Sequence, residues 1–502
     1  MQSEQQRPLQ TLDSNGSFAM VDEIQGSPST YHRVDDGDSE SGETLGDSNG
    51  GKTLGDLKSG ETLGDSKDGE TLGYSIPDLP KDIWCRIHSL MPMDAAARAA
   101  YLSHTFLSSW RCYPKLTLTR KALCSKTRGD KLIPRIDSIL RNHSGTGLKT
   151  LSLELFRERN SFPYIDGWLQ IAVKPGIEEL TLFLYEEYIF PISLLSLGVR
   201  SSVRSLELRS CVFRPTLELG PLRGLTRLGL RDVRITGQEL ECLLSNSLAL
   251  EHLDLIHCYE INFLKIPSTL RQLSCVKVCG CSYMQAVENK APSLSNFTFY
   301  GGVSKLSLGA TLPMMKVFIM RCDKVIHNAR ANLPSIMPNL KRLELGSTFE
   351  VNTPMLPTKF LNLKHLIIQV HQKYMEHESV FEGSSHLRQL PECRHERLKS
   401  FEVIGFSSAK GLVELTCCIV KNAISLKRLT LDTLHGYSCL GGPDDSDYCD
   451  NICCPVSEDV VVEEAFRGVA AIRKYIDNKV PPTAELIVLE PCPRCHTAKW
   501  IE

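Results

Sequence analysis

Apolar residues recur after residue 145 in one local pattern, apolar-x-x-apolar-x-apolar. Segments such as LKTLSLEL, LEHLDLIHC and LKRLTLDT repeat this pattern along the chain at intervals of 20–35 residues. Because apolar and polar positions alternate within each unit, each unit is predicted to form a short strand with one buried face. The twelve units start at Leu148, Ile177, Val203, Leu225, Leu250, Leu270, Leu294, Met315, Leu340, Leu363, Leu398 and Leu426.

This pattern and its period are those of the leucine-rich repeat. One unit cannot bury its apolar face alone, so residues 146–435 are expected to stack into a solenoid with a curved parallel sheet and an irregular, partly helical convex side. The predicted fold class is therefore α/β. Cys211 and Cys258 occupy the position where a small residue lies inside the repeat turn, and both are predicted to be buried structural thiols.

The strand residues between the buried leucines are expected to face the concave side of the sheet, since side chains alternate along a strand. In the repeats LELRS and LDLIH, the residues at these positions are Glu207, Arg209, Asp254 and Ile256. For any one of them, a solvated strand face is the simpler interpretation. As a set they are the candidate substrate-binding residues.

An apolar pattern of helical spacing occupies residues 76–120. Ile83, Ile87 and Leu90 follow one another at i, i+4 and i+7, which places them on one face of a helix that should end at Pro92. Asp94 is the expected N-cap of a second helix, and a third short helix should follow. Three short helices form a very small core that usually requires a further surface to pack against. The residues alone leave open whether this unit caps the repeats or docks onto a partner.

The same stretch resembles the F-box motif in residue order and spacing, up to its closing Trp110-Arg111 pair. In that family the motif docks onto a Skp-family adaptor, which links it to a cullin and a ubiquitin-conjugating enzyme. The resemblance implies that Trp110 packs inside the module and that eight residues meet the adaptor. These eight are Leu79, Pro80, Ile83, Ile87, Leu90, Pro92, Ala96 and Ser103. The family often has a bulky aliphatic residue where Ala96, Ala97 or Ala100 stands, a departure that would lower the affinity for the adaptor.

Residues 393–433 resemble the FBD region that follows the repeats in many plant F-box proteins. The matching residues are Leu398-Lys399, Gly405-Phe406, Glu414-Leu415, Asn422-Ala423 and Leu426. The resemblance implies a strand, a helix from about Leu412 to Asn422 and a second strand, with a structural role. It favours a plant F-box and leucine-rich repeat protein.

The octet GDSNGGKT at residues 46–53 fits the P-loop pattern, but it lies within a nine-residue repeat that starts at Gly42, Gly51, Gly60 and Gly69. Lys52 stands where the other copies have Glu. A working P-loop needs a strand before it and a helix after it, and flanks rich in Gly, Asp and Ser favour neither. Residues 1–75 are therefore predicted to be a disordered low-complexity arm, and a nucleotide-binding enzyme is the least favoured function.

Residues 436–502 form a cysteine-bearing tail, in which a helix is expected from about Glu458 to Ile476 and a last strand at AELIVLE. Cys492 and Cys495 have the C-x2-C spacing with which two thiolates bind zinc. The candidates for completing such a site are His496, Cys449, Cys453 and Cys454. Because the two halves are about 40 residues apart and the first half does not match a zinc knuckle, reduced thiols are the favoured interpretation, and no cofactor is expected.

Charge and composition limit the classes of partner that are expected. The net charge is −2, which provides no bulk field that would attract nucleic acid or a membrane. No apolar run approaches the roughly 20 residues that span a bilayer, and no charged start precedes an apolar core as in a signal peptide. Nineteen cysteines, an odd number, are then most simply reduced thiols. We expect a cytoplasmic and/or nuclear protein that binds neither nucleic acid nor membrane.

No H-E-x-x-H, G-x-S-x-G or dinucleotide-binding motif occurs in a suitable setting. The F-box resemblance therefore implies a non-catalytic subunit that recognises substrates for an SCF-type ubiquitin ligase, with the repeats binding an unknown protein target. Residues 121–145 would be a helical linker between the module and the repeats. The alternative is a leucine-rich repeat scaffold for protein interaction that takes no part in a ligase.

Overall fold

We describe the chain with a computed structural model. It describes residues 79–491, with gaps at 124–131, 156–161, 186, 217–218, 302–304, 309–311, 313, 322–332, 348–359, 371–377, 383–385, 389–393 and 435–458. The described residues all belong to one compact unit, Pro77–Glu502. The P-loop-like octet and the six candidate zinc ligands of the tail lie outside them.

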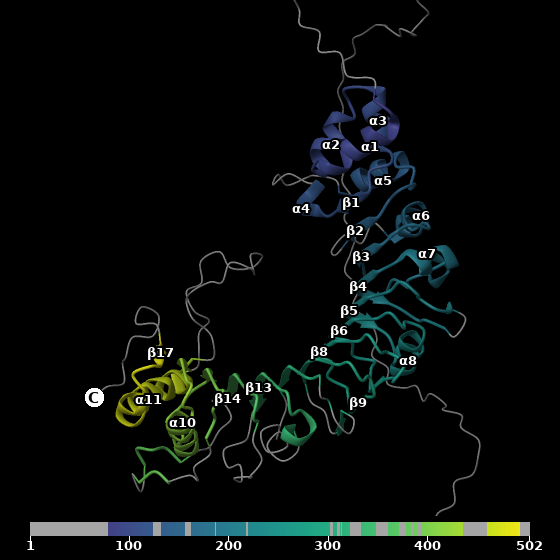
Figure 1. Cartoon of the computed structure of the whole chain (residues 1–502). Helices are drawn as coiled ribbons and strands as arrows, with labels where there is room; N and C mark the ends of the chain where they lie inside the picture. The colour runs from purple at the N-terminus through teal and green to yellow at the C-terminus, as the bar shows by residue number, and fades with distance from the viewer. Residues whose placement is uncertain are drawn as a thin grey trace, which may run out of the picture. The chain divides into compact units, whose positions relative to one another are not determined.

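The repeats form a continuous parallel sheet in which each strand pairs with the strand of the next repeat (Figure 1). The twelve predicted units all supply strands, which confirms the solenoid. Two further strands, β1 and β17, extend the sheet at its ends. The fourteen strands, in order across the sheet, are β1 Lys115–Leu118, β2 Thr150–Glu154, β3 Glu179–Phe183, β4 Ser205–Val212, β5 Arg227–Arg234, β6 His252–Ile256, β8 Cys275–Cys279, β10 Asn296–Tyr300, β12 Val317–Arg321, β13 Arg342–Ser347, β14 His365–Val370, β15 Ser400–Ile404, β16 Arg428–Asp432 and β17 Glu485–Leu489.

One repeat starts three residues later than predicted. Cys275 of β8 pairs with His252 of β6, so the repeat residue equivalent to Leu250 is Leu273 and not Leu270. Both leucines are fully buried. Leu270 lies in the turn before the strand, where an apolar residue also packs against the core, so the residue type alone does not fix the register.

The leucines of each strand point into one core, and the residues between them point to the other face. Cys211, near the end of β4, and Cys258, in the turn after β6, are buried as predicted, and Cys281 takes the same repeat position one repeat later. Burial raises the pKa of Cys211 to about 12, so this thiol stays protonated. The Cys258 thiol donates to the carbonyl oxygen of Leu230 at 3.5 Å. These cysteines therefore have a structural role.

The side of the sheet that carries the buried leucines is covered irregularly, as predicted. Helices α6 Phe162–Ala172, α7 Leu197–Ser202 and α8 Gly237–Ser245 lie along this side (Figure 1). Thr236 and Glu239 form a capping box that starts α8. A second, three-stranded parallel sheet of β7 Phe263–Ile266, β9 Ala286–Asn289 and β11 Lys305–Ser307 was not predicted.

Three short helices precede the sheet, α1 Lys81–Leu90, α2 Met93–Ala99 and α3 His104–Trp110. The N-cap of α2 is Pro92, without a side-chain cap, so the prediction of Asp94 as the N-cap is wrong. Asp94 instead pairs with Arg98 one turn later, at 3.0 Å. Helices α4 Arg120–Leu123 and α5 Leu132–Asn142 follow β1 in the stretch that was expected to be helical.

The C-terminal elements agree with the sequence pattern. Helix α10 Lys410–Asn422 connects β15 to β16, as the FBD resemblance implied. Helix α11 Asp459–Tyr475 packs against α10, and β17 follows it as the last strand of the sheet. The ring of Tyr475 lies against Phe381, and its backbone oxygen accepts a hydrogen bond from the Cys417 thiol at 3.4 Å. This helix is therefore part of the repeat core.

Candidate functional site

Helix α1 has two apolar faces, and only one of them is covered. Trp84 and His88 point inward, where Trp84 makes an edge-to-face contact with Phe106 at 4.9 Å between ring centroids. Ile83, Ile87 and Leu90 lie on the other side of the helix with 43%, 36% and 72% of their surface exposed. Large aliphatic side chains at helical spacing on an open face are typical of a docking surface.

The connection between α2 and α3 adds two apolar residues that the sequence did not single out. Tyr101 is 92% exposed and Leu102 is 73% exposed. Because they lie in a turn, helical spacing does not predict that they are exposed. They border a groove of about 740 Å³ between α2, α3 and the helices α4 and α5, where Leu107 and Ile139 form part of the wall.

The other predicted adaptor contacts have different places in the fold. Pro80 and Pro92 are exposed, and Leu79 is partly buried. Ser103 is the N-cap of α3 and accepts a hydrogen bond from the Phe106 N–H at 3.2 Å, so its hydroxyl already has a structural partner. Ala96 is fully buried in the chain's own core. The prediction that Ala96 meets an adaptor is therefore wrong for this conformation, since no atom of it reaches the surface.

Trp110 lies where the F-box resemblance placed it, inside the module. Its side chain is buried and its ring lies 5.3 Å from that of Tyr113. The Tyr113 hydroxyl donates to the backbone oxygen of Met91 at 2.8 Å and so ties the segment just before β1 to the turn between α1 and α2. The amide of Thr117 also contacts the Met93 sulfur at 3.4 Å. The helices are thereby joined to the first strand of the repeats.

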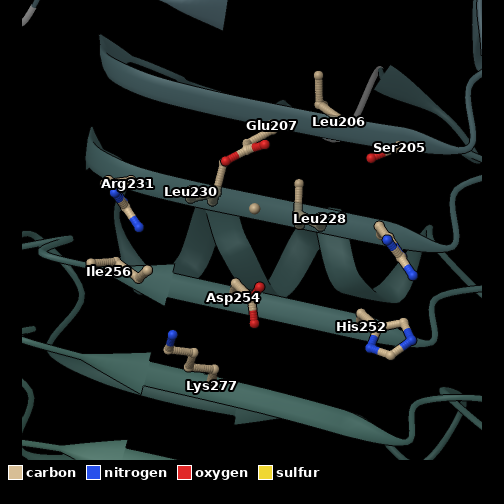
Figure 2. A pocket seen from close by; sticks show the side chains of 12 residues that line it. Ser205, Leu206, Glu207, Leu228, Leu230, Arg231, His252, Asp254, Ile256 and Lys277 are labelled. Atoms are coloured by element: carbon tan, nitrogen blue, oxygen red, sulfur yellow. The ribbon is translucent and has the colours of Figure 1, made fainter. Parts of the chain in front are cut away.

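The sheet face opposite α6, α7 and α8 is called the open face here. Glu207, Asp254 and Ile256 lie on it and surround a common pocket (Figure 2). Arg209 lies on the same face beside this pocket, and its guanidinium donates to the Glu207 carboxylate at 2.5 and 3.0 Å. The four predicted residues therefore do gather on one face.

This pocket lies at a glycine, which has no side chain to fill the space between its neighbours. Gly229 is the strand partner of both Glu207 and Asp254, so a gap lies between the two carboxylates. Arg227 and Arg231 stand two residues before and after the glycine on β5. The resulting pocket has a volume of about 370 Å³, and Lys277 closes its far side (Figure 2). Sequence reasoning missed Gly229 because an absent side chain leaves no apolar or charge pattern.

Two kinds of feature, a metal cluster and a membrane-spanning helix, are absent from the described residues. They contain no cluster of three or more His, Cys, Asp or Glu side chains arranged to hold a metal. None of their helices is long and apolar enough to cross a membrane. On the open face the Arg209 guanidinium pairs with the Glu207 carboxylate, so charges of both signs lie beside the pocket.

Comparison with known proteins agrees with this architecture. The family described as "At1g61320/AtMIF1, LRR domain" matches residues 139–373 and 366–493 of the chain. A relative from Arabidopsis thaliana, described as a putative F-box/FBD/LRR-repeat protein, is 25% identical over 402 residues, which cover 71% of this chain and 89% of the relative. The chain therefore belongs to the At1g61320/AtMIF1-type leucine-rich repeat family and is similar to plant F-box/FBD/leucine-rich repeat proteins.

Proposed function

We propose that this protein is a substrate-recognition subunit of an SCF-type ubiquitin ligase. The helical module would bind a Skp-family adaptor, and through it a cullin, while the repeats bind a target protein. The observation that carries the proposal is the uncovered aliphatic face of α1, formed by Ile83, Ile87 and Leu90. The resemblance to F-box proteins and the similarity to a relative described as one support it.

The apolar face has the character of a protein interface. Covering the exposed parts of these three side chains favours association by less than the roughly 1.5–3 kcal/mol that full burial of each would give, because Ile83 and Ile87 are already more than half covered. Tyr101 and Leu102 would extend the contact across the turn between α2 and α3. Aromatic and aliphatic anchors close to one another are typical of the centre of an interface.

Such a subunit acts by proximity. A target held on the open face would present its lysines near a ubiquitin thioester that another subunit carries, which raises the effective concentration of the two groups. No acid, base or nucleophile from this chain is needed, which agrees with a non-catalytic role. The free cysteines of the described residues also agree with the proposed location in the cytoplasm, the nucleus or both.

Co-purification with a Skp-family adaptor tests the proposal. We expect the full chain to retain the adaptor and Ile83→Asp with Ile87→Asp to lose it, because two carboxylates would be desolvated in the interface. The matched control is Leu197→Asp with Leu248→Asp, which changes two exposed leucines on the repeats and should retain the adaptor. If the wild-type chain captures no adaptor at low salt, the protein is instead a repeat scaffold in which the helices serve as a cap.

A further inference from the structure

A row of five lysines runs along one edge of the sheet. Lys316, Lys341, Lys364, Lys399 and Lys427 each directly precede the strands β12 to β16. The amide of each of the last four donates to the backbone oxygen of the lysine before it, at 2.8–2.9 Å. These backbone bonds fix the five residues in register on neighbouring strands, so we name this row the lysine ladder.

The backbone register places residues of like charge on neighbouring strands. Neighbouring strands lie about 4.8 Å apart, so adjacent ammonium groups repel one another unless a counter-charge is present. Four of the five lysines are exposed and Lys364 is partly buried. No ion pair connects any of them to a carboxylate among the residues that the structure describes. Nearby His365 responds to this charge, since burial and then Arg342, Lys364 and Lys399 lower its pKa.

The same row is neutral in the first repeats. There Lys149 is followed by Glu178, and the Lys149 ammonium pairs with the Glu178 carboxylate at 2.8 Å. Arg204, Thr226, Glu251, Ser274 and Ser295 continue the row up to Lys316, so its two cations are balanced by two carboxylates. A run of lysines is therefore not required by the repeat turn, because serine, threonine and glutamate also fit the position.

The edge beside three of these lysines is hollowed. A groove of about 460 Å³ is lined by Lys316, Lys341, Lys364 and Arg397, with two asparagines and a methionine completing it. Arg397 is held in place by a hydrogen bond to the side-chain oxygen of Asn362. Among the described residues that line it, the groove offers four cations and no carboxylate.

We propose that the lysine ladder binds an acidic segment of a partner polypeptide. The ladder runs across five neighbouring strands and spans about 19 Å. Because each residue of an extended chain advances about 3.3 Å, a segment of about six residues matches this distance. Residues 79–502 hold 52 of the 57 Lys and Arg residues but 43 of the 59 Asp and Glu residues, so this part of the chain is positive overall and favours an anionic partner.

The lining favours a polypeptide over single-stranded nucleic acid. Proteins that bind single strands combine a positive groove with aromatic rings on which the bases stack. The described residues that line this groove include no aromatic side chain. Lysine ammonium groups suit carboxylates, and each has three donors for charge-assisted hydrogen bonds. This inference does not rest on the proposed ligase function.

Fluorescence anisotropy of the full chain with labelled octaglutamate tests the proposal. We expect the wild type to bind the peptide and to lose affinity as salt is raised. Lys316→Gln/Lys341→Gln/Lys364→Gln should weaken binding about tenfold or more, because three charge-assisted contacts are lost. The variant with three Lys→Arg changes at the same positions keeps the charge and should retain binding.

The matched control is Lys121→Gln/Lys265→Gln/Lys290→Gln, which removes the same charge elsewhere. Lys265 and Lys290 pair with Glu241 and Glu288, and Lys121 is exposed on α4. This control should change the affinity by less than about twofold. Equal weakening by both triple variants, or no binding of octaglutamate by the wild type, would overturn the proposal. Tighter ladder-dependent binding of octauridylate RNA would overturn the choice of an acidic polypeptide.

Discussion

At the scale of single residues, His88 is the least usual side chain of the helical module. It is fully buried on the inner face of α1, 5.1 Å from the Phe106 ring, and neither ring nitrogen has a hydrogen-bond partner among the described residues. His143 is also buried, but its Nε2 meets the Tyr113 oxygen and its Nδ1 accepts from the Gly145 N–H, both at 2.9 Å. His88 therefore bears a desolvation cost that His143 avoids.

The His88 environment predicts a pH-dependent stability. Burial lowers the pKa of His88 below the value of about 6.5 that an imidazole has in the unfolded chain. The unfolded state then binds the proton more readily than the folded state. The free energy of unfolding is therefore highest above about pH 6.5 and falls as the pH drops from that value toward the pKa of folded His88. His88→Leu should lose less stability than the wild type between about pH 7.5 and pH 5.5.

Urea unfolding at the two pH values, followed by tryptophan fluorescence, measures this difference. The buried residues Trp84 and Trp110 report on the module directly. His143 and His365, whose pKa values are also lowered by burial, remain in both proteins and contribute equally. An identical pH dependence for wild type and His88→Leu would show that His88 is hydrated or paired in solution.

At the scale of elements, the repeat pattern predicted most of the sheet. It missed β1, although Tyr113, Leu116 and Leu118 fit apolar-x-x-apolar-x-apolar, because they lie within the stretch assigned to the helical module. It misplaced the repeat of β8 because Leu270 and Leu273 both satisfy the first position. The strands β7, β9 and β11 span only three or four residues each, too short for a distinct period.

The candidate surfaces were predictable to different degrees. Ile83, Ile87 and Leu90 follow from helical spacing, and Glu207 and Asp254 follow from strand alternation. The pocket at Gly229 depends on which residues pair across strands, which the register alone decides. The lysine ladder was visible in the units LKRLEL, LKHLII, LKSFEV and LKRLTL, where Lys directly follows the first apolar residue. The sequence alone does not show that these lysines lie side by side, which follows from the pairing of their strands.

The lysine ladder also predicts an effect on stability. Lys341 lies between Lys316 and Lys364, so Lys341→Glu replaces two repulsive contacts with two attractive ones. We expect the free energy of unfolding to rise by a few tenths to about 1 kcal/mol, as for other exposed ion pairs. Lys341→Gln should give a smaller gain because it only removes the repulsion.

Urea unfolding at low and high salt measures this effect. The gain should shrink at high salt, since screening weakens both the repulsion and the new ion pairs. A lower midpoint for Lys341→Glu at low salt would indicate that the ladder is already neutralised within the chain.

At the scale of the whole described unit, the helical module and the repeats share one hydrophobic core. Buried residues continue from Ala96 and Trp110 through the leucines of the strands to Ile476 on the C-terminal side. The module therefore packs onto one end of the repeats and is not an independent domain. Its inner face is satisfied by the chain itself, and the aliphatic face of α1 remains free for a partner.

Three surfaces of the described unit differ in their chemistry. The face of α1 is apolar, the pocket at Gly229 carries both charges, and the lysine ladder is basic. A receptor that joins an adaptor to a target needs at least two such surfaces, with different chemistry so that the partners do not compete. Under the proposed function, the adaptor binds the face of α1.

Hydrogen exchange of the full chain, measured with and without a purified Skp-family adaptor, tests whether the adaptor binds this face. We expect the adaptor to slow amide exchange in residues 79–103, which contain α1, α2 and the turn with Tyr101 and Leu102, and to leave exchange in the strands β4 to β8 unchanged. Protection of the repeats without protection of residues 79–103, or no protection anywhere at saturating adaptor, would contradict this expectation.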